Sequence, residues 1–88
     1  MRQPVIAVYP GTFDPITLGH LDLVRRACAL FDQVVVGVAM AHHKKTMFSL
    51  DERLEMVQEA TASLGSVRVA PFDGLVRDFV RAQGGVVM

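Results

Sequence analysis

The sequence predicts an α/β fold with a Rossmann-like parallel sheet, in which strands and helices alternate as β-α-β-α-β-α-β. Four short apolar runs are separated by longer segments whose apolar residues recur at helical spacing. The second run, residues 34–40 (VVVGVAM), is apolar on both faces, as strands of parallel sheets are. Strict alternation of this kind requires right-handed crossovers between parallel strands.

The first strand and the first helix are joined by a loop rich in glycine and proline. We place the strand at residues 5–9 and the helix at residues 19–31, directly before the run at 34–40. Four residues at helical spacing make the apolar face of this helix: Leu21, Val24, Cys28 and Phe31.

The second helix begins with a capping-box pattern. Ser49 is its expected N-cap, and Glu52 reaches back to the Ser49 amide. The helix runs to about residue 64, and we expect Gly65 to end it in a left-handed conformation. The residues expected to point inward are Leu54, Val57, Ala60 and Leu64.

The remaining elements are a short strand, a helix and the beginning of another strand. Residues 67–69 are the third strand, and residues 86–88 begin the fourth. Between them, Gly74 opens a helix that Gly84 and Gly85 end. Its apolar stripe is Leu75, Val76, Phe79 and Val80. Because a terminal apolar strand needs a following helix to cover it, we expect residues 1–88 to be the N-terminal part of a single longer domain.

Composition narrows the classes of partner. Nine Lys and Arg residues balance nine Asp and Glu residues, so we expect neither nucleic acid nor a membrane surface as a partner. No apolar run approaches the ~20 residues of a membrane span. The single cysteine excludes an internal disulfide and fits a reducing cytoplasm. Hydrophobic residues make up 51% of the chain, which predicts apolar surface for further chain or for other subunits.

The most informative motif is residues 9–20 (YPGTFDPITLGH), which join the first strand to the first helix. Parallel α/β sheets bind ligands beyond the carboxyl ends of their strands, and the amides at a helix N-terminus attract anions. Thr12, the nearby loop amides and His20 therefore indicate a phosphate site. For a bare T-x-G-H tetrapeptide, Thr17 is more simply a helix cap and His20 an ordinary first-turn residue. Twelve continuous residues in this setting favour function.

Two further loops reach the same edge of the sheet. In the loop at residues 41–48, one lysine of the pair Lys44 and Lys45 would hold a phosphate as a point charge, and the other is solvated. The histidines before them lack a ligand set, so we expect no metal site there. In the loop at residues 70–74, Asp73 is expected as a helix N-cap or turn residue. After this loop come Leu75 and Val76, which either line a substrate pocket or pack in the core.

The motifs of several common kinds of enzyme site do not occur in the sequence. Neither the P-loop pattern nor the dinucleotide-binding glycine pattern occurs, and no Ser-His-Asp or Cys-His pair indicates a covalent nucleophile. Phosphate-binding donors without an obvious general base suit direct in-line displacement on a phosphoryl group. Catalysis of that kind depends mostly on positioning and charge stabilisation.

Three segments together resemble the bacterial phosphopantetheine adenylyltransferases, which are nucleotidyltransferases with an H/T-x-G-H motif. They are YPGTFDPITLGH at 9–20, KKTMFSLDER at 44–53 and F-x-x-L at 72–75. The resemblance implies a cytoplasmic, homohexameric enzyme of coenzyme A biosynthesis that moves AMP from ATP to 4′-phosphopantetheine, with Mg²⁺ as cofactor. Members of the family continue with R/K-G-x-R and I-S-S-T-type segments that this sequence lacks. We therefore expect the 88-residue chain alone to turn over poorly.

The resemblance also implies roles for individual residues. Thr12 and Phe13 would contact ATP through the loop backbone, and Thr12 would also lie near the phosphate of phosphopantetheine. His20 would bind ATP and stabilise the transition state at the α-phosphate. Lys44 would be a catalytic and substrate-binding lysine. The pantetheine arm would lie against Leu75 and Val76.

Two other interpretations stay open. Cytidylyltransferases and nicotinamide-nucleotide transferases share H-x-G-H chemistry, but they usually carry His or Asn at the position of Thr17. They also do not resemble residues 44–53. The third interpretation is a non-catalytic nucleotide-binding or assembly fragment.

Overall fold

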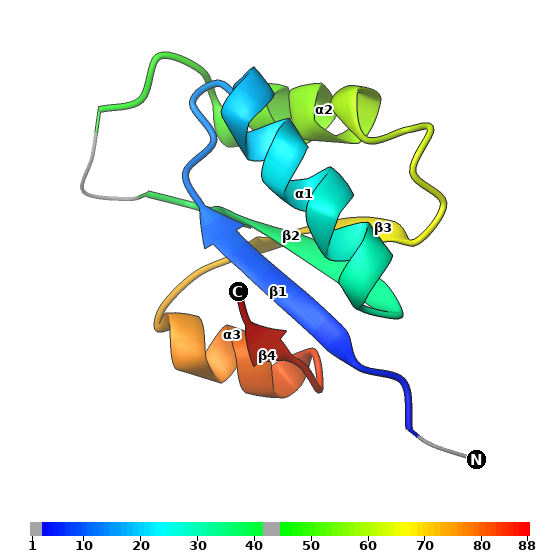
Figure 1. The fold of residues 1–88 in the computed structure, drawn as a ribbon. Helices are drawn as coiled ribbons and strands as arrows, with labels where there is room; N and C mark the ends of the chain where they lie inside the picture. The colour runs from blue at the N-terminus through cyan, green and yellow to red at the C-terminus, as the bar shows by residue number, and fades with distance from the viewer. Residues whose placement is uncertain (1–2, 42–44) are drawn as a thin grey trace.

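A four-stranded parallel sheet in the order β3-β2-β1-β4 forms the centre of the molecule (Figure 1). The computed structural model describes residues 3–41 and 45–88. The elements are β1 (Ile6–Gly11), α1 (Leu18–Leu30), β2 (Gln33–Ala39), α2 (Leu50–Ala60), β3 (Val67–Phe72), α3 (Val76–Ala82) and β4 (Val86–Val87). The strands pair in parallel, with β2 between β1 and β3 and β4 beside β1. The predicted fold class is confirmed.

Helices cover both faces of this sheet, α1 and α2 one face and α3 the other (Figure 1). Alternate residues of β2 serve the two faces, because successive side chains of a strand point in opposite directions. On the first face, the core contains Val34, Val36 and Val38 with Val24 of α1 and Val57 of α2. On the second face, the core contains Val8, Val35, Phe72 and Phe79. The apolar run therefore forms a strand that is buried on both sides, as its composition predicts.

The order of the strands reverses beside β1. The chain passes from β1 to β2 and β3 on one side and then returns to place β4 on the other. In open parallel sheets, ligands bind at this reversal, outside the carboxyl ends of the strands. The loop that leaves β1 at Gly11 and enters α1 at Leu18 therefore lies at the edge where the fold favours a ligand.

Strand β3 is longer than residues 67–69, and this corrects the loop expected at residues 70–74. Ala70 pairs with Gly37, and Phe72 pairs with Ala39, so the strand continues through Phe72. Its ring is buried and stacks on Phe79, with the two centroids 4.6 Å apart. Burial of this aromatic ring extends the strand, and Pro71 is tolerated because β3 is an edge strand of the described sheet.

The ends of two helices also differ from the expectation. Helix α2 ends at Ala60, with Thr61 as its C-cap, whose amide and hydroxyl both donate to the Val57 carbonyl, at 3.0 and 2.8 Å. Gly65 does not supply a left-handed stop. Helix α3 begins at Val76 with Leu75 as its N-cap, so Asp73 is not the cap. Gly74 has a positive φ (+88°) and lies in the turn before α3, so it is not the first residue of the helix.

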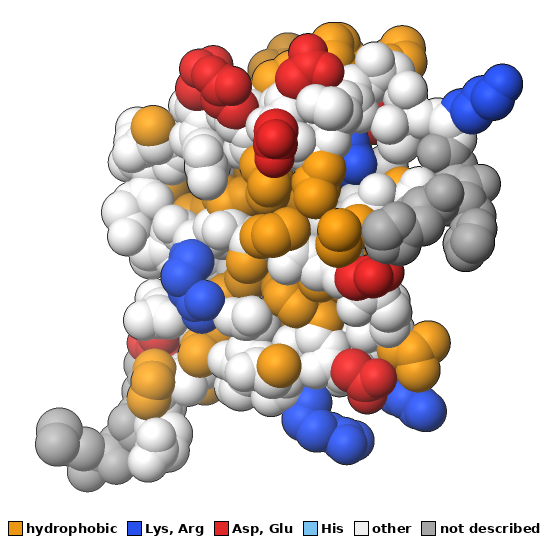
Figure 2. Space-filling view, turned by 180° about the vertical axis from the view of Figure 1, so that it is seen from behind, with side chains coloured by type: hydrophobic (Ala, Val, Ile, Leu, Met, Phe, Trp, Pro, Cys, Tyr) orange, Lys and Arg blue, Asp and Glu red, His pale blue; other side chains and the backbone are white. Residues whose placement is uncertain are grey.

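Apolar side chains remain on the surface, as the composition predicts. Figure 2 shows hydrophobic side chains gathered across the middle of one face. On α1, Leu18 and Leu30 are 85% and 78% exposed. Within the described part of the chain, no helix has both the length and the apolar character needed to cross a bilayer.

Candidate active site

The loop after β1 is fixed from inside by an aromatic ring. Phe13 has φ of +50° and is 3% exposed. Its ring packs edge-on against Tyr9, at a centroid distance of 5.3 Å, and against His20, at 5.0 Å. Because the ring is buried among these partners, the backbone around it is held in one place. The side chain of Phe13 is part of the core, so only its backbone is left for the contact with a nucleotide, which is predicted through the loop backbone.

The start of α1 is a complete capping box built from the T-x-G-H tetrapeptide. The Thr17 hydroxyl accepts from the His20 amide at 3.2 Å, and His20 Nδ1 accepts from the Thr17 amide at 3.0 Å. A ring nitrogen that accepts a hydrogen bond carries no proton, so in the neutral imidazole the proton sits on Nε2. His20 can thus offer an N–H donor at the electropositive end of a helix. The capping role considered for Thr17 is present.

The loop after β2 is tied to the β1 loop by Asp14. The Asp14 carboxylate accepts from the amides of Met47 and Phe48 at 2.6 and 2.8 Å. This brings the end of the loop at residues 41–48 against the loop of residues 9–20, as the shared edge of the sheet predicts. Lys45 is exposed. Lys44, with His42 and His43, lies outside the described residues.

Sequence reasoning missed the role of Arg53, the most deeply buried charged side chain among the described residues, at 1% exposure. Its guanidinium donates to four backbone carbonyls from three segments that meet at the carboxyl edge of the sheet. One signal would have found it. Arg53 lies four residues before the inward-facing Val57, on the face of α2 that packs on the sheet.

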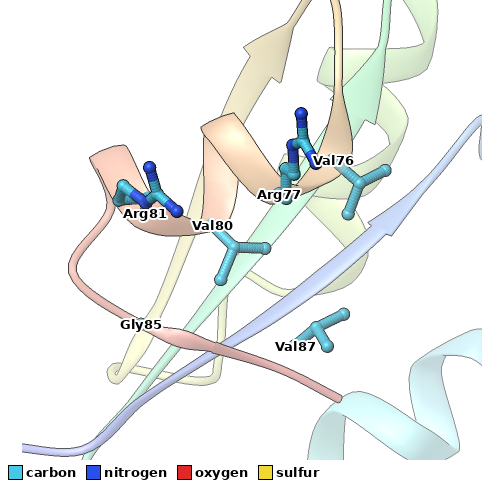
Figure 3. Close-up of a pocket in the computed structure, with 6 residues that line it drawn as sticks. All are labelled: Val76, Arg77, Val80, Arg81, Gly85 and Val87. Atoms are coloured by element: carbon cyan, nitrogen blue, oxygen red, sulfur yellow. The ribbon is translucent and has the colours of Figure 1, made fainter.

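The pair expected to line a substrate pocket lies at the start of α3, on the face of the sheet opposite α1 and α2. Leu75 and Val76 are 55% and 41% exposed, so packing in the helix core is wrong for both. Val76 lines a groove of about 530 Å³ between α3 and β4, into which Val80 and Val87 also point (Figure 3). The other residues of the groove are Arg77, Arg81 and Gly85. Contact with a pantetheine arm stays a prediction.

The described donors suit an anion better than a metal ion. Across residues 3–41 and 45–88, no three His, Cys, Asp or Glu side chains come together as a ligand set. Both oxygens of the Asp14 carboxylate already accept backbone amides. The groups gathered around the β1 loop are amides, a hydroxyl and an imidazole N–H. With these donors, a magnesium ion at this site would take its ligands mainly from nucleotide phosphates and water.

Comparison with known proteins identifies the family of this chain. The family model described as cytidylyltransferase-like matches residues 8–87. The chain belongs to the cytidylyltransferase-like family. This cytidylyltransferase-like chain is 66% identical over 84 residues to a protein of Acidovorax sp. (strain JS42), and 55% identical over 83 residues to one of Moorella thermoacetica. Both relatives are named phosphopantetheine adenylyltransferase, which confirms the resemblance found in the sequence.

The match covers nearly all of this cytidylyltransferase-like chain but only part of the relatives. The two alignments cover 96% and 94% of the chain, and 51% and 52% of the relatives. The chain therefore spans about half the length of the curated relatives it matches.

Solved structures share the fold. One is the NadR protein in complex with NAD and AMP-PNP, with a TM-score of 0.72 and 23% identity, covering 81% of this chain and 21% of that one. Another is a bifunctional NMN adenylyltransferase/ADP ribose pyrophosphatase from Francisella tularensis, with a TM-score of 0.69 and 22% identity. That likeness covers 93% of this chain and 25% of the other. At such identities the likeness shows the fold alone.

Proposed function

We propose that this chain carries the phosphate-binding part of an adenylyltransferase of coenzyme A biosynthesis. The reaction moves AMP from ATP to 4′-phosphopantetheine and gives dephospho-coenzyme A and pyrophosphate. The observation that carries the proposal is the His20 imidazole, held by the Thr17 amide with its Nε2 proton available at the N-terminus of α1. The names of the relatives supply the substrates.

In this mechanism the chain positions phosphates and stabilises charge. His20 donates its Nε2 proton in a hydrogen bond to an oxygen of the α-phosphate, where negative charge grows in the transition state. The amides of the β1 loop and the first turn of α1 bind the phosphates, with Thr12 also near the phosphate of phosphopantetheine. Lys44 adds a point charge. An oxygen of phosphopantetheine bonds to the α-phosphorus as the bond to pyrophosphate breaks, without a covalent enzyme intermediate.

Other parts of the proposal concern the surroundings of the reaction. Magnesium, when bound to the triphosphate, neutralises part of its charge. Leu75 and Val76 line the pantetheine arm, which their exposure beside the groove of α3 supports. Assembly into a homo-oligomer, a hexamer as in the family, is supported by the exposed Leu18 and Leu30. A cytoplasmic location is supported by the single cysteine.

Titration calorimetry on the 88-residue chain tests the substrate assignment. We expect ATP and 4′-phosphopantetheine each to bind. Binding of CTP or NMN with no response to phosphopantetheine would instead support a cytidylyl- or nicotinamide-nucleotide transferase, which the cytidylyltransferase-like family model also accommodates. Heat from subunit association alone would support a non-catalytic assembly fragment.

Pyrophosphate release tests catalysis. We expect the chain alone to release pyrophosphate slowly from ATP plus phosphopantetheine, because it spans about half the length of its relatives. A chimera in which this chain replaces the matching 84 residues of the Acidovorax relative supplies the remainder. That chimera is expected to turn over, and its His20→Ala variant to lose most of the rate. A chimera that folds but does not turn over contradicts the proposal.

A further inference from the structure

We propose that Arg53 is a positioning residue of this site, which holds the β1 loop and the β2–α2 loop in the arrangement that binds polyphosphate. The inference rests on the proposed function. Arg53 touches neither reacting group in this scheme. It acts through the backbone of the two loops that carry the phosphate donors.

Four backbone carbonyls accept hydrogen bonds from the Arg53 guanidinium. Nη1 donates to the carbonyl of Thr12 at 2.9 Å and to that of Ala39 at 2.7 Å. Nη2 donates to Met40 at 3.4 Å, and Nε donates to Phe48 at 3.2 Å. These carbonyls belong to the β1 loop, to the end of β2 and to the residue before the N-cap of α2. One side chain thus fixes three segments that are distant in sequence.

The burial of this side chain shows how much the fold depends on those partners. A buried cation is costly unless its donors are satisfied, and in the described part of the chain Arg53 finds only carbonyl oxygens. A planar guanidinium with five N–H donors can reach several carbonyls at fixed angles. A lysine ammonium, with a different donor geometry, cannot reproduce this fork.

Asp14 adds a second tie between the same loops. Phe48 is held on both sides, since its amide donates to Asp14 at 2.8 Å and its carbonyl accepts from Arg53. Arg53 therefore binds both ends of the β2–α2 loop, at Met40 after β2 and at Phe48 before α2. The basic residues of the loop lie between these two points in the sequence.

The bond to Thr12 also sets the direction of one amide. In a trans peptide, the carbonyl and the following N–H point in opposite directions. Because the Thr12 carbonyl points to the buried guanidinium, the Phe13 amide points away from it. This is one of the loop amides assigned to phosphate binding. Arg53 thus fixes the orientation of an amide of the proposed site without touching the ligand.

The test compares Arg53→Met with Val57→Ala in the 88-residue chain. Val57 is fully buried one turn further along α2, so its truncation destabilises the same helix without touching either loop. Pyrophosphate is the probe for binding, and amide hydrogen exchange at Met47 and Phe48 reports the tie between the loops. We expect Arg53→Met to weaken pyrophosphate binding about tenfold or more and to speed exchange at both amides by a similar factor. We expect Val57→Ala to change only the exchange of core amides.

Several outcomes would overturn the inference. One is equal effects of the two variants on binding after correction for the unfolded fraction. Another is unchanged exchange at Met47 and Phe48 in a folded Arg53→Met. If Arg53→Met does not fold, Arg53→Lys replaces it, and pyrophosphate affinity equal to that of the unmodified chain overturns the inference. If the unmodified chain binds neither pyrophosphate nor ATP, the proposed function fails, whereas the exchange data still decide whether Arg53 ties the loops.

Discussion

Substitutions at His20 distinguish its capping hydrogen bond with the Thr17 amide from its proposed hydrogen bond to phosphate. In His20→Glu, the carboxylate keeps an acceptor for the Thr17 amide, because Glu is the usual third residue of a capping box. It also places a negative charge at the N-terminus of α1, which contributes about 0.3–1 kcal/mol. His20→Ala loses the acceptor. Since a typical hydrogen bond contributes about 0.5–1.5 kcal/mol, we expect the alanine variant to be less stable than the glutamate variant by about 1–2 kcal/mol.

Both variants lose the packing of the imidazole on Phe13 and Tyr9, with centroids at 5.0 and 6.2 Å, so this term cancels in the comparison. Binding should behave differently from stability. A hydrogen bond to a charged group contributes about 1.5–3 kcal/mol, so either variant should lose at least tenfold in pyrophosphate affinity. Repulsion should make the glutamate variant the weaker binder despite its greater stability. His20→Gln keeps an acceptor for the Thr17 amide without the negative charge, so it is the matched control for repulsion in His20→Glu.

Urea unfolding and pyrophosphate titration on the same samples measure the two effects. Equal unfolding free energies for His20→Ala and His20→Glu would contradict a stabilising acceptor for the Thr17 amide at position 20. Unchanged pyrophosphate affinity in His20→Glu would show that the imidazole does not face the anion.

Two further predictions concern the scaffold. In Gly37→Ala, the new Cβ would lie 2.4 Å from a ring carbon of Phe79 and 3.2 Å from one of Phe72, so urea unfolding should show a loss of about 1–3 kcal/mol. Gly65→Ala, where nothing lies within 4 Å, should change little, and equal losses would contradict the clash. Hydrogen bonds from the backbone and then the side chain of Ser49 lower the pKa of Glu52 below its usual 4.5. This capping contribution is therefore present above the unfolded pKa and lost as pH falls through the folded one, so Glu52→Gln should flatten the acid limb of stability against pH.

The sequence predicts those parts of the fold that local patterns determine. The run at residues 34–40 identifies β2, and the box formed by Ser49 and Glu52 identifies the start of α2. The errors occur at the ends of elements, where individual side-chain contacts are made. Phe72 extends β3, where its ring stacks on Phe79, and α2 stops at Ala60, where Thr61 is the C-cap and bonds back to Val57. Neither contact leaves a periodic signal at the end of the element it fixes.

The same distinction applies to the site. The β1 loop and His20 are contiguous in sequence, so one motif reveals them. The bonds of Arg53 to Thr12 and of Asp14 to Met47 join residues 41 and 33 positions apart. The residue types alone do not show which carbonyls and amides these side chains meet. The sequence thus shows which residues each loop contains. The hydrogen bonds of Arg53 and Asp14 that hold the loops together become apparent only in the structure, where the sheet brings the ends of the loops to one edge.

The T-x-G-H tetrapeptide shows why a structural and a functional interpretation need not compete. From the sequence, an ordinary cap and a phosphate-binding histidine stand as alternatives. In the structure, the cap itself specifies the chemistry, because the bond from the Thr17 amide to Nδ1 places the imidazole proton on Nε2. A histidine without that bond would divide between two tautomers, of which only one presents this donor. The cap therefore fixes the tautomer that the proposed phosphate-binding role of His20 requires, and a single hydrogen bond connects the two interpretations.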